Sequence, residues 1–222
     1  MPDSEFLKPA YFVDSDHPGI QAFAHSRTSP SMSAREKAVA LFYQVRDGFR
    51  YTPFRIDLRK TAMRASRLLE LQQSYCVHKA ALFAAGCRVH GIPSRLCFFN
   101  VKNHLGTGEL ERALGTDLIV FHGGAEVYLD GRWLKVVPAF DAPICSKIGV
   151  APLEFDGTAD AKFQEHLDAS GTKRFMEYLH DYGSFADFPH ELAMRELRRH
   201  YPHAFDRSVP KEKRIMFADW DD

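Results

Sequence analysis

Residues 72–95 read QQSYCVHKAALFAAGCRVHGIPSR, and the organisation of the chain follows from this stretch. Small and apolar residues recur in it at helical spacing, and the Gly-Ile-Pro sequence at 91–93 is a typical helix stop. We therefore predict a helix from about Cys76 to His90. At the start of that helix, free backbone N–H groups and the positive end of the helix dipole would lower the pKa of Cys76. Cys76 is thus a candidate nucleophile, although a buried cysteine more often serves only as a small apolar side chain.

The overall composition is that of an ordinary globular protein. The 222 residues are 45% hydrophobic and 26% charged, and 29 Lys and Arg balance 29 Asp and Glu. This balance gives no overall field that would draw the protein to nucleic acid or to an anionic membrane. A peptide, a protein or a small amide is therefore the more reasonable substrate. The sequence carries no indication of an oligomeric state.

The length favours a single domain over residues 1–205, followed by a charged, peripheral tail over 206–222. The N-terminal region lacks a basic start followed by an apolar run, and no run of about 18 apolar residues occurs, so a cytoplasmic protein is expected. Four cysteines are too few for a disulfide framework and should be free thiols in a reducing compartment. They are Cys76, Cys87, Cys97 and Cys145.

Helical patterns precede the Cys76 helix. A short helix is predicted over 17–26, and a longer one over 34–47, where Ser33 and Glu36 have the spacing of a capping box. Residues 58–71 continue the helical pattern. We therefore expect the N-terminal half of the chain to be helical.

The pattern then changes to that of strands. Residues 95–101 alternate and predict a first strand, residues 103–115 a polar loop, and 118–129 and 132–140 a hairpin turning at Asp130-Gly131. A two-residue turn there sets Tyr128 opposite Trp133, Glu126 opposite Lys135, and His122 opposite Ala139.

Helices are predicted again in the C-terminal region, over 162–167, 172–182 and 189–200. Gly183 would follow the second of these helices, and Asp187 would cap the third. The predicted fold class is therefore α+β, with helices at both ends of the chain.

Thiol catalysis requires a base for the sulfhydryl proton and a third group that orients the base. His122 begins the second predicted strand and is the candidate base. If the hairpin pairing persists past Pro138, Asp141 lies opposite Val120 and diagonal to His122, about 7–8 Å away between backbones and within side-chain reach. Cys76, His122 and Asp141 are therefore the candidate catalytic set.

Three segments resemble the transglutaminase-like superfamily of bacterial proteins. They are the cysteine helix in YCVHKAALFAAGCRVHGIPSR, the histidine strand in FHGGAEVYLDGRW, and the acid after the next strand in LKVVPAFD. The likeness extends over about residues 15–145. It implies a papain-like transglutaminase core, in which an N-terminal helical half packs on an antiparallel β-sheet and the C-terminus is helical.

Residue by residue, the resemblance implies Cys76 as nucleophile, His122 as general base and acid, and Asp141 as the orienting carboxylate, with no metal or organic cofactor. The chain departs from the family pattern twice. Val137 stands four residues after Trp133, where the family commonly has its acid, and Gly124 stands where many members carry an aromatic residue.

Other residues were weighed as alternatives. His78 points about 200° away from Cys76 on a helix and is interpreted as structural or exposed, and His90 as a helix-end residue. His104 is an alternative substrate contact, and Gln73 could donate an amide to an oxyanion. A zinc site would need Cys76 and His78 together with Cys87 and His90, which lie about 15 Å further along the helix.

The sequence therefore predicts acyl transfer on an amide or peptide bond through a cysteine thioester, with hydrolysis slightly favoured over transamidation. The alternative is a non-catalytic protein-interaction module that retains the same core.

Overall fold

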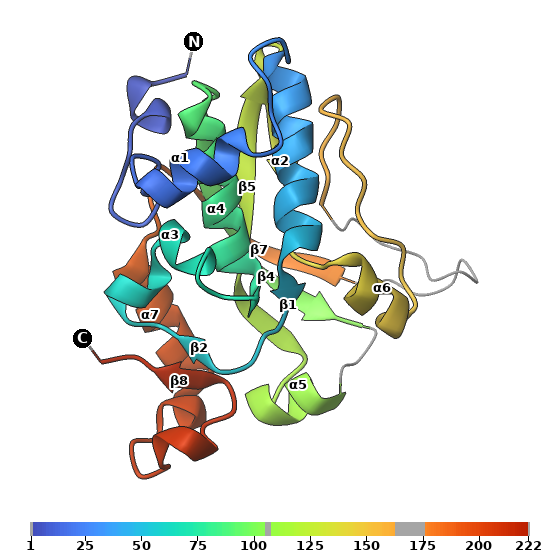
Figure 1. Cartoon of the computed structure of the whole chain (residues 1–222). Helices are drawn as coiled ribbons and strands as arrows, with labels where there is room; N and C mark the ends of the chain where they lie inside the picture. The colour runs from blue at the N-terminus through green and yellow to red at the C-terminus, as the bar shows by residue number, and fades with distance from the viewer. Residues whose placement is uncertain (1, 105–107, 163–175, 222) are drawn as a thin grey trace.

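The computed structural model describes residues 2–104, 108–162 and 176–221. Helix α4 lies at the centre, with α1, α2 and α3 packed on it and the long strand β5 beside it (Figure 1). The main sheet is antiparallel, with the strand order β6-β5-β4-β7. The predicted α+β class, with a helical N-terminal half packed on an antiparallel sheet, is confirmed.

Three α-helices and three two-residue strands precede α4 in the described chain, and the strands of the main sheet follow it. The α-helices are α1 (Pro18–His25), α2 (Ala34–Gly48), α3 (Ala65–Leu68), α4 (Cys76–Val89), α5 (Gly108–Leu114), α6 (Ala142–Ile148) and α7 (His190–His200). The strands are β1 (Arg50–Tyr51), β2 (Ile56–Asp57), β3 (Gln73–Ser74), β4 (Ser94–Asn103), β5 (Leu118–Leu129), β6 (Arg132–Val136), β7 (Met176–Phe185) and β8 (Phe217–Asp219). Short 3₁₀ helices span Ser4–Leu7, Lys60–Met63, Pro202–Phe205 and Lys211–Lys213.

The two long N-terminal helices agree with their sequence signals. Ser33 and Glu36 form the reciprocal capping box at the start of α2, which satisfies two otherwise free N–H groups. Helix α4 begins at Cys76, and the chain turns away from it at Gly91, whose φ of +68° suits glycine. Small side chains allow α4 to be buried along nearly its whole length. Helix α4 is therefore the core element around which the other layers pack.

The β5–β6 hairpin has the predicted register over its whole length. Tyr128 pairs with Trp133 and Glu126 with Lys135, but the pairing ends at Ala125 and Val136. The expected pair between His122 and Ala139 is therefore wrong. The chain leaves β5 because the N–H of Val137 donates to the carbonyl of Ala161 and because Pro138 has no N–H to offer.

The C-terminal predictions were less successful. Residues 176–182, expected to be helical, belong to β7, which pairs with β4 along its length. Gly183 has a φ of +88° within that strand and does not follow a helix. Asp187 accepts hydrogen bonds from the N–H groups of Phe12 and Val13 and does not cap α7. Helix α7 itself is confirmed, whereas 163–167 and 172–175 of the other two predicted helices lie outside the described residues.

Two shorter stretches also differ from prediction. Residues 108–114 of the expected polar loop form α5. The helical pattern over 58–71 is broken into a 3₁₀ turn and the single-turn helix α3, because Arg64 between them has an extended backbone.

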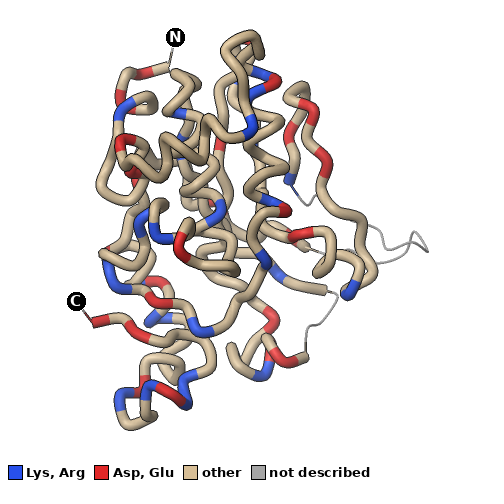
Figure 2. The backbone as a smooth tube through the Cα atoms, viewed as in Figure 1, with Lys and Arg blue, Asp and Glu red and all other residues tan. Residues whose placement is uncertain are grey.

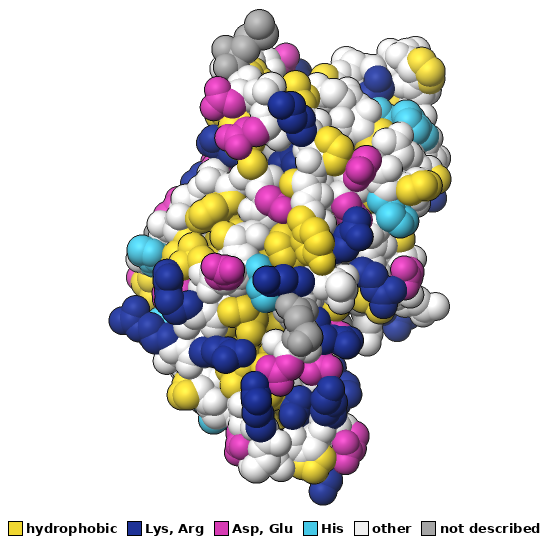
Figure 3. Space-filling view, turned by 90° about the vertical axis from the view of Figure 1, so that its left-hand side faces the viewer, with side chains coloured by type: hydrophobic (Ala, Val, Ile, Leu, Met, Phe, Trp, Pro, Cys, Tyr) yellow, Lys and Arg dark blue, Asp and Glu magenta, His cyan; other side chains and the backbone are white. Residues whose placement is uncertain are grey.

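The segment after Asp206 is not peripheral. Strand β8 pairs in parallel with β2, and Phe217 and Trp220 are buried. Positively and negatively charged residues are interspersed along the described backbone (Figure 2). On the face shown in Figure 3, Lys and Arg gather toward the lower end, with Asp and Glu among them and hydrophobic side chains above. None of the described helices has the length and apolarity needed to cross a bilayer.

Candidate active site

Cys76 occupies the first position of α4 and faces β5. The N–H of Gly123 donates to its Sγ at 3.3 Å. Gly123 has no room for a side chain, because a Cβ there would lie 2.8 Å from the Cα of Val77. The missing side chain therefore lets the backbone of β5 reach the start of α4, and it brings the residue that follows His122 into contact with Cys76.

Burial decides the protonation of Cys76 in this structure. The residue is only 5% exposed, and desolvation raises the pKa of its thiol to about 11. Hydrogen bonds from the N–H groups of Gly123 and Val77 and the charge of Lys79 act in the opposite direction. The expectation of a lowered pKa is therefore wrong for this closed state, because the loss of water outweighs the helix start.

Lys79 follows Cys76 by one turn and is fully buried. Its Nζ donates to the carbonyls of Arg46 and Phe49 at 2.7 and 2.8 Å, near the C-terminal end of α2. Desolvation lowers its pKa to about 8, and the nearby carboxylate of Asp141 opposes this shift. The sequence analysis missed Lys79, although a lysine inside an apolar helix is itself a signal that a buried partner exists.

His122 follows a β-bulge. Phe99 pairs with His122 and Val101 with Ile119, so β5 has one residue more than β4 between these pairs. The extra residue is accommodated at Phe121, whose φ of +61° is in the left-handed region. The N–H of Phe121 donates to the Oδ1 of Asn100 at 3.1 Å. The bulge changes the direction in which His122 points relative to a regular strand.

The ring of His122 is buried without hydrogen bonds. It is 0% exposed, and neither ring nitrogen has a hydrogen-bond partner among the described residues. The ring of Phe140 stacks on it with a centroid distance of 6.4 Å and an interplanar angle of 18°. Desolvation lowers the pKa of His122 to about 4, so the imidazole is neutral at pH 7.

The carboxylate of Asp141 is hydrogen bonded to two backbone N–H groups and not to His122. It caps α6 by accepting from the N–H of Ile144 at 3.1 Å, and its other oxygen accepts from the N–H of Tyr51 at 2.5 Å. It makes no hydrogen bond to His122. At the position four residues after Trp133, the side chain of Val137 lies against Gly124, where an added Cβ would meet it at 3.2 Å. The structure therefore brings Cys76 to the strand of His122 but does not join Asp141 to the histidine ring.

Two aromatic rings border the site. Tyr51 and Phe140 have ring centroids 4.4 Å apart, and Phe140 also stacks on His122. Burial, and then the negative charge that Cys76 carries as a thiolate, raise the pKa of Tyr51 well above its ordinary value. Neither ring was identified from the sequence.

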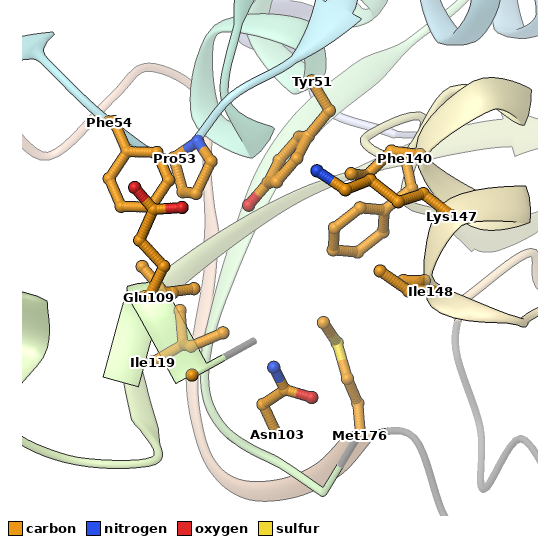
Figure 4. Close-up of a pocket in the computed structure, with 13 residues that line it drawn as sticks. Tyr51, Pro53, Phe54, Asn103, Glu109, Ile119, Phe140, Lys147, Ile148 and Met176 are labelled. Atoms are coloured by element: carbon orange, nitrogen blue, oxygen red, sulfur yellow. The ribbon is translucent and has the colours of Figure 1, made fainter. Parts of the chain in front are cut away.

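A cavity of about 270 Å³ borders these two rings, which are part of its lining (Figure 4). Its lining is mainly apolar, with a few polar groups at its edge. The lining residues are Tyr51, Pro53, Phe54, Asn103, Gly108, Glu109, Leu110, Ile119, Phe140, Ile144, Lys147, Ile148 and Met176.

The other candidate residues lie in different surroundings. His78 is hydrogen bonded to Ser74 and to the carbonyl of Ala62, and His90 to Thr28 and to the carbonyl of Ala24. His104 pairs with Glu177 at 2.9 Å. Gln73 lies in β3 with an exposed side chain. Within the described ranges, no three His, Cys, Asp or Glu residues are grouped so that they could hold a metal ion.

Comparison with known proteins connects this geometry to a family. A solved structure of a candidate cysteine protease from Cytophaga hutchinsonii resembles the chain at a TM-score of 0.46 and 19% identity. The match covers 81% of this chain and 53% of that protein, so the present chain corresponds to about half of its length. No curated protein matches the chain. The family model of the transglutaminase-like superfamily matches residues 21–138, which is more than half of the chain and includes Cys76 and His122, and the protein therefore belongs to that superfamily.

Proposed function

We propose that the protein transfers the acyl group of an amide or peptide through a thioester on Cys76. His122 takes the thiol proton as Sγ attacks the carbonyl carbon, and it returns that proton to the departing amine as the C–N bond breaks. Water or a second amine then attacks the thioester, loses its proton to His122 and releases the thiol. The observation that carries this proposal is the contact between Sγ and the N–H of Gly123, directly beside a neutral histidine without hydrogen bonds.

The resting site is closed, and the proposal includes an opening step. Cys76 is a buried thiol, and no hydrogen bond joins it to the ring of His122. Catalytic hydrogen bonds often become short only in the substrate complex. Substrate entry beside Tyr51 and Phe140 would open the site and allow His122 to reach the sulfur.

Asp141 is, in this proposal, the carboxylate that orients the site. Its hydrogen bonds to the N–H groups of Tyr51 and Ile144 hold the Tyr51 segment and α6 together. It therefore acts through these two segments in the closed state. The variant Asp141→Asn would weaken both bonds while it keeps the size of the side chain.

Thiol labelling tests the nucleophile directly. Cys87, at the other end of α4, is buried at 0% exposure, desolvation raises the pKa of its thiol, and no N–H group donates to its sulfur among the described residues, so it is a matched control. Because the closed site raises the pKa of Cys76, labelling depends on the open state, in which His122 can take the thiol proton. Iodoacetamide should modify Cys76 faster than Cys87 and faster than it modifies Cys76 in His122→Leu, as read by peptide mass mapping. Modification of Cys76 no faster than of Cys87 would contradict an activated nucleophile.

Product analysis separates the two outcomes of acyl transfer. The protein is incubated with amide substrates in the presence and absence of a primary amine, and products are identified by mass. Free acid in both cases indicates hydrolysis, which we slightly favour, whereas a new amide indicates transamidation. The variant Cys76→Ala should form neither product.

A second candidate is a non-catalytic interaction module. Val137 stands at the usual position of the acid, and the ring of His122 has no carboxylate partner in the described structure. These two observations favour a protein that retains the fold of the superfamily but has no catalytic activity. The absence of both labelling at Cys76 and turnover of amides would decide for this alternative.

A further inference from the structure

The cavity beside Tyr51 and Phe140 has the properties of a specificity site. We propose that it binds an uncharged aromatic or branched aliphatic side chain of the substrate, next to the bond attacked by Cys76. The assignment of the occupant to an amide substrate rests on the proposed function. The binding of such a side chain can be tested independently of it.

The position of the cavity supports this inference. Strand β1 pairs with β3 so that Tyr51 lies opposite Ser74, and the N–H of Thr52 donates to the carbonyl of Ser74 at 2.8 Å. The segment that begins with Tyr51 therefore crosses the chain two residues before Cys76. Tyr51 and Phe140 line the cavity, and Phe140 also stacks on His122. The cavity therefore shares a lining residue with the surroundings of the candidate base.

The size and the lining of the cavity define the class of occupant. Helix α6 presents Ile144 and Ile148 to it on one face, and Ile119, Leu110 and Met176 complete the apolar lining. Its volume of about 270 Å³ exceeds the roughly 150 Å³ of an apolar cavity that accommodates benzene. A leucine or phenylalanine side chain therefore fits, and a glycine would leave the cavity empty.

The charged groups at the cavity do not select a charged ligand. Glu109 and Lys147 enter from opposite sides (Figure 4), and no ion pair involving either is present in the described part of the chain. Because one is negative and the other positive, their electrostatic potentials largely cancel at the centre, which therefore favours neither a cation nor an anion. A neutral side chain can occupy the centre while the polar amide group of the same ligand meets these charges at the edge.

The experiment measures binding without catalysis, in the variant Cys76→Ala. The probes are the N-acetyl amides of phenylalanine, leucine, glycine and aspartate, titrated by protein NMR. Phenylalanine and leucine amides should bind about tenfold or more tightly than the glycine amide, and the aspartate amide no better than glycine. Adding Ile148→Trp should fill the cavity and abolish this preference.

Two further variants show whether the effect of Ile148→Trp comes from filling the cavity. Ile215→Trp is the same substitution at a residue that is 56% exposed and does not line the cavity, and it should leave binding unchanged. Ile148→Ala enlarges the cavity and should shift the preference from leucine toward phenylalanine, with folding checked by circular dichroism. Equal binding of all four amides, or equal loss in both tryptophan variants, would overturn the cavity assignment.

These outcomes remain distinct from those of the proposed function. Selective binding in Cys76→Ala without turnover by the unmodified protein would refute acyl transfer and keep the cavity as a side-chain site. Turnover that is indifferent to the side chain would refute the cavity assignment alone.

Discussion

His78 and His122 are both buried histidines near Cys76, and they differ in one respect. His78 is 4% exposed, and its ring is hydrogen bonded on both sides, to Ser74 at 2.7 Å and to the carbonyl of Ala62 at 2.9 Å. His122 is 0% exposed and has no hydrogen bond from either nitrogen within the described residues. Buried polar groups in proteins are almost always satisfied, so the ring of His122 requires an explanation that the ring of His78 does not. In the proposed function His122 finds its partner in the thiol and the substrate, whereas the partners of His78 are already present.

The largest difference is expected in reactivity. His122→Leu should reduce acyl transfer by about 10²- to 10⁴-fold, because a general base and acid is lost. It should also abolish any acceleration of iodoacetamide labelling at Cys76. His78→Leu, assayed where circular dichroism shows a folded protein, should leave both rates largely unchanged. Equal losses in the two variants would mean that the comparison does not identify the base.

The next largest effect is expected in the pH dependence of stability, and the two rings should share it equally. Desolvation lowers the pKa of both rings to about 4, below the ordinary value of 6.5. The unfolded chain therefore binds more protons between pH 6.5 and 4, and the free energy of unfolding falls as the pH is lowered through this range. Each ring contributes up to about 1.4 kcal/mol per pH unit.

Urea denaturation at several pH values between 6.5 and 4.5 measures this slope. Either His78→Leu or His122→Leu should remove about half of the part that the two rings contribute. A slope that neither variant changes would show that these rings do not titrate as buried groups.

At pH 7.5 we expect a smaller difference between the two variants, because His78→Leu should lower the free energy of unfolding and His122→Leu should not. His78→Leu leaves the hydroxyl of Ser74 and the carbonyl of Ala62 without their partner, which should cost about 1–3 kcal/mol. His122→Leu removes two unsatisfied nitrogens and should be neutral or stabilising. Midpoints of urea unfolding provide the measurement, and a strongly destabilised His122→Leu would point to a partner that the closed structure lacks.

The smallest expected difference concerns which ring nitrogen carries the proton when each histidine is neutral. The carbonyl of Ala62 can only accept, so His78 carries its proton on Nε2 and accepts the hydroxyl proton of Ser74 at Nδ1. His122 has no such constraint. In spectra of ¹⁵N-histidine-labelled protein at pH 7, His78 should show one tautomer and His122 a mixture. A single hydrogen-bonded tautomer at His122 would remove the contrast.

The sequence predicted those parts of the structure that local signals determine. The limits of α4 followed from a stop signal at 91–93, and the register of the β5–β6 hairpin followed from Asp130-Gly131, because a two-residue turn permits one alignment. The family pattern led to Cys76 and His122. Both residues occur inside the matched region, and the N–H beside His122 contacts Cys76.

The predictions were wrong where contacts between segments far apart in the sequence determine the structure. Strand β7 is formed by pairing with β4, which overrides the helical composition of residues 176–182. The hairpin stops at Val136 because residue 137 finds a partner at Ala161, 24 positions away. The direction of the pKa shift at Cys76 depends on how completely the fold excludes water, and no local pattern records that.

The parallel pairing of β8 with β2 affects the order in which the site can form during synthesis. The N–H groups of Arg55, Ile56 and Leu58 donate to carbonyls of Ile215, Met216 and Asp219. The segment that carries Tyr51 and Phe54 is therefore anchored by residues translated some 160 positions later. A nascent chain whose residues 215–219 have not yet left the ribosomal exit tunnel lacks that anchor, so the segment that carries Tyr51 is held in place only once those residues have emerged.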